Sequence, residues 1–213
     1  MKTVGIVLRE FVAEVRSTEV PLYAVRRDLV SYLRKYDVNV IGIPLISRTD
    51  DEEEIKRVKP IIDMCDGIIF PGGVTCSYLD SDLARYLHEI DKPTLGFCLG
   101  MQVLGRAFNG NKLEKIDGTN HSSQEEYVHN AIINENSKLY EILGAKEIKV
   151  NSRHNYCIKE TELDIVAYSD DGIVEAIEDR DKKFYIGVQW HPESLPEDQY
   201  SKKLFDYYIK SLS

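Results

Sequence analysis

Cys98 has a glycine two residues away on either side, where a short apolar run gives way to a helical pattern. Thr94–Phe97 is the apolar run and Met101–Phe108 has helical character, so the cysteine should lie at a sharp turn from a strand into a helix. Residues 96–100 match G-x-C-x-G, the cysteine form of a nucleophile elbow. The two glycines remove Cβ atoms that would clash as the helix packs back across the strand.

Cys98 is the best candidate for a reactive cysteine in this chain. A helix N-terminus beneath the thiol favours the thiolate through its positive dipole and free N–H groups. The alternative is a small buried packing residue, and the elbow by itself does not decide between the two. The remaining cysteines show neither zinc spacing nor a C-x-x-C pair. We interpret Cys65 and Cys157 as packing residues, assign no chemistry to Cys76, and predict neither a metal nor a cofactor.

Length and charge exclude several classes of function. A chain of 213 residues, 43% hydrophobic, is long enough for one well-buried core and short for two, so we expect a single domain over residues 1–213. A net charge of -9 offers no general attraction to nucleic acid or to an anionic membrane. The first apolar run meets Arg9 too early for a signal peptide, and no run approaches the roughly 20 residues of a membrane span. We therefore expect a cytoplasmic protein.

The first half of the chain alternates apolar runs with helical patterns, which predicts a parallel sheet with helices between its strands. Predicted strands are Val4–Leu8, Val38–Ile43, Gly67–Phe70 and Thr94–Phe97. A loop is predicted over Arg9–Pro21, followed by helices over about 22–36, 50–64 and 80–90. Pro71-Gly72-Gly73 follows the third strand, at the same sheet edge as Cys98, where its backbone N–H groups could bind an anion or a developing oxyanion.

The second half is predicted to be richer in antiparallel strands. Residues 109–124 are polar and loop-like; strands are predicted at 128–133 and 147–150, a short helix at 138–143, a hairpin of 173–177 with 184–189, and a last helix over 199–212. His191 and Glu193 follow the second hairpin strand, with Pro192 between them. A cysteine nucleophile needs a base, and the base needs a group that fixes its tautomer, so this pair fits those two roles.

The chain resembles the class I glutamine amidotransferase superfamily over nearly its whole length. Gly96–Gln102 and Gly187–Glu193 match the two main signatures in the usual order, with Pro71-Gly72-Gly73 ahead of them. The resemblance implies a flavodoxin-like α/β fold: a three-layer sandwich with a mostly parallel central sheet and a small antiparallel β extension. It also implies a catalytic triad of Cys98, His191 and Glu193. The backbone N–H groups of Gly73 and Leu99 would form an oxyanion hole, and Gln102 would be one of the residues of a γ-glutamyl pocket.

Within the superfamily the chain is most similar to the γ-glutamyl hydrolase branch, peptidase family C26, which includes the γ-glutamyl-γ-aminobutyrate hydrolases. The likeness lies in residues 150–154, in residues 171–178 and in His129 ahead of a strand. Residues 151–156 depart from the usual Asn-Ser-x-His-His-Gln, the usual acidic and Pro-Tyr residues after Pro-Gly-Gly are missing, and Leu99 replaces an arginine. These departures leave the identity of the amine open.

By the same resemblance, His154, Asn155 and Tyr156 are predicted to bind substrate beside Gln102. His154 has an equal alternative, a hydrogen bond to loop backbone. His121 and His129 are interpreted as structural.

The implied activity is hydrolysis of a small γ-glutamyl amide through a thioester on Cys98, releasing glutamate and an amine. The alternative is a glutaminase subunit that supplies ammonia to a separate synthetase. A non-catalytic binding protein is the third possibility, and the intact Cys98, His191 and Glu193 argue against it. A homodimer and a synthetase partner both stay open, and no nucleic-acid or membrane partner is expected.

Overall fold

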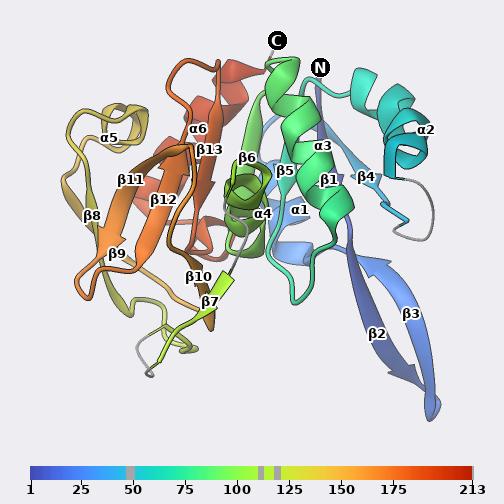
Figure 1. Cartoon of the computed structure of the whole chain (residues 1–213), viewed down its shortest axis with the longest axis horizontal. Helices are drawn as coiled ribbons and strands as arrows, with labels where there is room; N and C mark the ends of the chain where they lie inside the picture. Colours follow the sequence, from blue (N-terminus) through green and yellow to red (C-terminus); the bar gives the residue numbers. More distant parts are fainter. Residues whose placement is uncertain (47–50, 110–112, 118–120, 213) are drawn as a thin grey trace.

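A nine-stranded sheet forms the centre of the computed structural model, which describes residues 1–46, 51–109, 113–117 and 121–212 (Figure 1). The strands lie in the order β4 (Val38–Ile43), β1 (Lys2–Val7), β5 (Gly67–Phe70), β6 (Thr94–Phe97), β13 (Tyr185–Val188), β12 (Val174–Glu178), β11 (Asp164–Ser169), β8 (His129–Ile133) and β9 (Glu147–Val150). The strands from β4 to β13 are parallel, and those from β13 to β9 pair antiparallel.

Helices cover both faces of this sheet. One hydrophobic cluster joins the sheet to α1 (Arg27–Leu33), α5 (Lys138–Leu143) and α6 (Gln199–Ser211). A second joins the opposite face to α2 (Asp51–Asp63), α3 (Tyr78–Glu89) and α4 (Leu99–Ala107). The predicted flavodoxin-like three-layer arrangement is confirmed, with the antiparallel extension built from the last four strands of the sheet order.

Local signals in the sequence explain where several helices begin. Ser77 and Asp80 form a reciprocal capping box at the start of α3. Ser137 caps α5 and Asp198 caps α6 by accepting backbone N–H bonds. The predicted bounds of α2 and α6 agree with the structure within a few residues, although Asp50, where the prediction for α2 began, lies outside the described residues.

The predicted loop over Arg9–Pro21 is wrong. Residues 9–24 form a hairpin of β2 (Arg9–Val15) and β3 (Thr18–Ala24), which projects from the body of the protein (Figure 1). Its side chains are mostly exposed on both faces of the hairpin. The sequence therefore lacks the alternation of apolar and polar residues that identifies a half-buried strand. The helix expected from about residue 22 begins only at Arg27, because the preceding residues pair in the hairpin.

Three further strands were not predicted. β7 (Leu113–Lys115) pairs with β10 (Tyr156–Ile158) in a two-stranded sheet, and β11 joins the main sheet. β7 falls within the predicted loop 109–124; the parts of that loop at 110–112 and 118–120 lie outside the described residues. β7 and β10 are only three residues long, too short to show a period. Within the described ranges, no helix is both long and apolar enough to cross a membrane.

Candidate active site

Cys98 occupies the turn between β6 and α4 in a strained backbone conformation. Its φ of 50° and ψ of -108° lie outside the regions that residues with a side chain ordinarily adopt. A Cβ on Gly96 would come within 2.7 Å of the Gly100 backbone, and one on Gly100 would collide with the carbonyl oxygen of Phe70. The Cys98 N–H donates to the Val188 carbonyl at 2.9 Å. The two glycines therefore allow the close contact between strand and helix that the turn requires.

His191 and Glu193 lie just beyond the end of β13, the strand that pairs with β6. The Nδ1 atom of His191 lies 2.7 Å from Glu193 Oε1, and Cys98 lies close enough to the imidazole to raise its pKa. Asn151 holds the His191 backbone from both sides: its Oδ1 accepts from the His191 N–H at 2.8 Å, and its Nδ2 donates to the His191 carbonyl at 2.9 Å. The structure thus brings together the three side chains that were predicted as a triad.

The environment of His191 favours the imidazolium. Burial lowers the pKa of His191, but the charge of Glu193, the nearby Cys98 and the hydrogen bond to Glu193 outweigh burial and raise the pKa to about 10. Besides Cys98, the chain has three cysteines, Cys65, Cys76 and Cys157, and burial raises the pKa of each of these thiols. These three are therefore poor nucleophiles at neutral pH.

Gly73 and Leu99, the predicted oxyanion-hole residues, lie against each other. A Cβ on Gly73 would come within 3.0 Å of Leu99 Cδ2, and a Cβ on Gly72 would come within 2.6 Å of His191 Cε1. The glycine turn after β5 therefore packs directly against the side chains of Leu99 and His191.

A buried arginine, which the sequence analysis did not identify, supports this turn. Arg9 donates from Nε and Nη2 to the Pro71 carbonyl at 3.2 and 3.1 Å, and its Nη1 lies 2.5 Å from Asp80 Oδ1. The side chains of Arg9 and Asp80 are only 8% and 9% exposed. The position of Arg9 directly after a buried strand could have indicated this role, because a charged side chain at such a place needs a buried partner.

A cavity of about 510 Å³ lies beside Cys98. Its wall includes all four predicted substrate-binding residues, Gln102, His154, Asn155 and Tyr156. Gln102 donates to the Tyr156 carbonyl at 2.8 Å and to Gln189 Oε1 at 3.2 Å, so its amide nitrogen already holds the wall together. His154 contacts the Tyr156 carbonyl through Nδ1 at 3.1 Å, while its Nε2 faces Glu175.

Two guanidinium groups that the sequence analysis did not propose as site residues also line this cavity. Arg106 contacts Cys76 Sγ at 2.8 Å, and Arg153 donates to Ser194 Oγ at 3.1 Å. They place positive charge beside Cys98 in a chain whose net charge is negative. Such a cavity suits a ligand that carries carboxylates.

Residues 77–193 match the peptidase C26 family, and the chain belongs to that family. It is 26% identical to the glutamine amidotransferase-like protein RP404 of Rickettsia prowazekii, covering 90% of each chain. It is 37% identical over 126 residues to PB2B2.05 of Schizosaccharomyces pombe, a candidate glutamine amidotransferase. That match covers 55% of this chain and 49% of the relative, so the chain matches about half of that relative's length.

Among solved structures, the fold is similar to a Trypanosoma brucei CTPS glutaminase domain with bound acivicin. The TM-score is 0.70 at 17% identity, covering 100% of this chain and 94% of the other. At that identity the likeness establishes the fold. Together with the C26 match, it places the chain among the glutamine amidotransferase-like proteins and supports an amidohydrolase.

Proposed function

We propose that this protein hydrolyses a small γ-glutamyl amide with Cys98 as nucleophile, His191 as base and acid, and Glu193 as the group that orients His191. The observation that carries the proposal is the strained Cys98 at the strand-to-helix turn, close to an imidazole that Glu193 holds at 2.7 Å. Strain at a turn that borders a cavity, with a paired base beside it, is typical of an active nucleophile.

The proposed reaction has two steps. Cys98 Sγ attacks the γ-carbonyl carbon, the N–H groups of Gly73 and Leu99 stabilise the oxyanion, and the His191 imidazolium donates a proton to the leaving amine. Water, deprotonated by His191, then attacks the thioester and releases glutamate, restoring the thiol. Glu193 remains ionised throughout and stabilises the imidazolium.

The charges at the cavity support a substrate that is anionic at one or both ends. The α-carboxylate of a γ-glutamyl group needs a cationic partner, and Arg106 and Arg153 both line the cavity beside Cys98. Contacts to the amine half can orient the scissile bond as well as bind it, so they should affect kcat as well as KM.

The alternative, a glutaminase that supplies ammonia to a separate synthetase, is supported by the likeness to the CTPS glutaminase domain. Both reactions use the same proposed thioester. They differ in whether the isolated chain is active and in which amide it prefers. A hydrolase has no reason to wait for a partner, whereas a partner-dependent glutaminase wastes glutamine if it is active alone.

The deciding experiment is a hydrolysis panel with the purified chain and no partner. Glutamine is compared with γ-glutamyl amides whose amines are neutral, cationic or carboxylated, with Cys98→Ala as the background control. We expect at least one γ-glutamyl amide to be cleaved faster than glutamine. Inertness toward the whole panel, together with glutamine hydrolysis once a synthetase from the same cell is added, would favour the alternative.

A further inference from the structure

Three histidines and one glutamate converge beside the catalytic cavity. His121 lies in the segment before β8, His129 begins β8, His154 lies between β9 and β10, and Glu175 lies on β12. One nitrogen or oxygen from each of the four lies within 4.8 Å of the other three. Glu175 is completely buried, and His121 and His154 are 2% and 5% exposed. The proposed reaction uses neither Glu175 nor the two histidines His121 and His129.

Within the described residues, four atoms at the centre of this cluster lack hydrogen-bond partners, and a fifth, His121 Nδ1, lies 3.4 Å from Ser152 Oγ. Glu175 Oε1 lies 3.5 Å from His129 Nε2, and 3.7 Å from both His121 Nδ1 and His154 Nε2, distances too long for hydrogen bonds. Among the described residues, neither Glu175 oxygen, nor His129 Nε2, nor His154 Nε2 has a hydrogen-bond partner. Buried polar atoms are almost always paired, so this group calls for something that binds at its centre.

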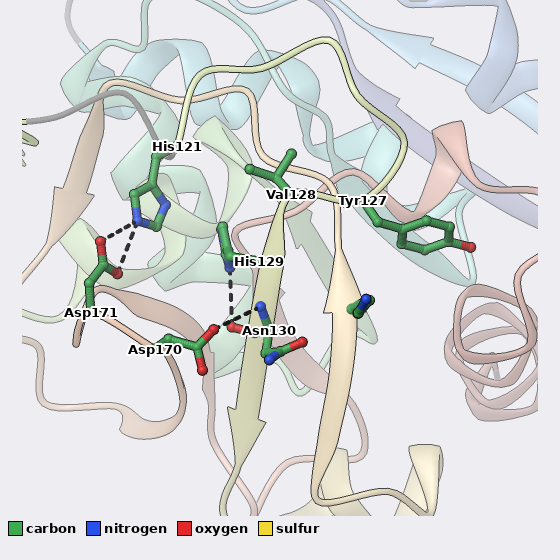
Figure 2. A pocket seen from close by; sticks show the side chains of 8 residues that line it. His121, Tyr127, Val128, His129, Asn130, Asp170 and Asp171 are labelled. Atoms are coloured by element: carbon green, nitrogen blue, oxygen red, sulfur yellow. Dashed lines mark hydrogen bonds and ion pairs between the residues drawn. The ribbon is translucent and has the colours of Figure 1, made fainter.

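The outer nitrogen of each imidazole, by contrast, faces an oxygen acceptor at 3.1 Å. His121 Nε2 faces the Asp171 carboxylate, and His129 Nδ1 faces the Asn130 carbonyl, as Figure 2 shows. His154 Nδ1 faces the Tyr156 carbonyl. If each outer nitrogen carries the proton, each inner nitrogen presents a lone pair toward Glu175. Histidines that bind metals are held by the same kind of outer partner.

We propose that His121, His129, His154 and Glu175 bind one divalent transition-metal cation, with Zn²⁺ the best match. Tetrahedral zinc with bonds of about 2.0–2.1 Å holds its ligand atoms roughly 3.3 Å apart. The three separations between Glu175 and the histidines, 3.5–3.7 Å, lie within a few tenths of an ångström of that value, and all the ligand atoms lie within 4.8 Å of one another. Three imidazoles favour zinc over Mg²⁺ or Ca²⁺, which prefer oxygen ligands.

The charge state of the cluster agrees with a bound cation. The completely buried Glu175 carboxylate faces three imidazoles at 3.5–3.7 Å, and a negative charge in that position needs a compensating positive charge. A divalent cation would supply that compensation.

Four protein ligands complete a tetrahedral shell, so the cation would stabilise structure rather than activate water. His154 also lines the cavity beside Cys98. The Tyr156 carbonyl that His154 contacts also accepts a hydrogen bond from Gln102. The metal would therefore fix one wall of the cavity beside Cys98. A separate cavity of about 410 Å³ is lined by His121, His129 and Asp171 among others (Figure 2). Its lining does not include Cys98, so it offers the cation a separate approach to the cluster.

The sequence analysis predicted no metal, because the four ligands come from four separate segments and show no short ligand spacing. Only the packing of β8 and β12 into the same half of the sheet, with the loops before β8 and after β9, brings them together.

Metal content of the untagged full chain tests the proposal. Protein exposed to Zn²⁺ and dialysed should retain about one zinc per chain by mass spectrometry, and Co²⁺ should give the visible absorption of a tetrahedral site. Glu175→Gln should weaken zinc affinity by more than about 100-fold, and Asp171→Asn by roughly 10–100-fold, since it removes only an outer partner.

Two control variants should bind zinc as the parent does. His88→Gln removes a histidine that pairs with Asp179 outside the cluster, and Cys98→Ala removes the thiol that could bind zinc with His191. Asp171 is half-exposed, so Asp171→Asn serves if Glu175→Gln does not fold, and the Co²⁺ spectrum needs no variant. Only trace zinc in the parent, or equal zinc affinity in the parent and in folded Glu175→Gln, would overturn the proposal.

Discussion

The side-chain amide of Asn151 forms two hydrogen bonds with the backbone of a single residue, His191. It accepts from the N–H and donates to the carbonyl, and Asn151 is completely buried. The two residues lie 40 positions apart, on a loop after β9 and a turn after β13. This pairing fixes the backbone from which the proposed base projects toward Cys98.

Asn151→Ala should therefore impair both stability and turnover. Removing the amide leaves the buried N–H and carbonyl of His191 unpaired, at about 1–3 kcal/mol for each group. We expect a lower free energy of unfolding and a kcat reduced by roughly 10- to 100-fold, because the imidazole loses its fixed position. Denaturant unfolding and steady-state kinetics measure the two effects. Asn155→Ala, an exposed asparagine in the same segment, should leave stability unchanged; an equal loss there would contradict the explanation.

Arg9 should prove to be a positioning residue for the glycine turn. Arg9→Met leaves Asp80 as an unpaired buried charge, which typically costs about 3–5 kcal/mol, and it also removes both bonds to the Pro71 carbonyl. Adding Asp80→Asn should recover much of the stability but not kcat, because the turn stays unsupported. Parent-like kcat in the folded double variant would show that Arg9 serves stability alone.

The alkaline limit of activity should depend on Glu193. With Glu193 ionised, the imidazolium of His191 persists until the pH approaches its pKa of about 10. Glu193→Gln removes the charge that raises this pKa and leaves burial, which lowers it, so the alkaline limb of kcat/KM should move to lower pH. The pH profile of kcat/KM, with the imidazole followed by NMR, measures the change. An unmoved limb would mean that another group controls it.

Cys98 should carry the covalent chemistry. A glutamine analogue with an electrophile at the γ position should add one mass equivalent to the peptide that contains Cys98, because burial raises the pKa of the other three thiols. Cys98→Ala should lower turnover by roughly 10⁴-fold, as expected for a nucleophile that acts in a unit. Labelling confined to Cys65, Cys76 or Cys157 would reject the assignment.

Local patterns in the sequence were sufficient for the central part of the fold. The parallel strands around Cys98 are continuous apolar runs, because both of their faces are covered, and such runs are visible without any partner. The two glycines around Cys98 likewise follow from the geometry of one turn. The hairpin over residues 9–24 was missed for the opposite reason, since its exposed faces leave no periodic signal.

The sequence by itself determined the positions of the parallel strands in the first half and the elbow, and it pointed to the proposed nucleophile, base and orienting acid, because each depends on neighbours along the chain. Only the tertiary structure decided that Arg9 supports Pro71, that Asn151 holds His191, and that His121, His129, His154 and Glu175 share one buried centre. Those relationships join segments far apart in the chain. The residues next to a side chain in the sequence do not indicate which distant residue it will contact after folding. That contact depends on the order of the strands in the sheet.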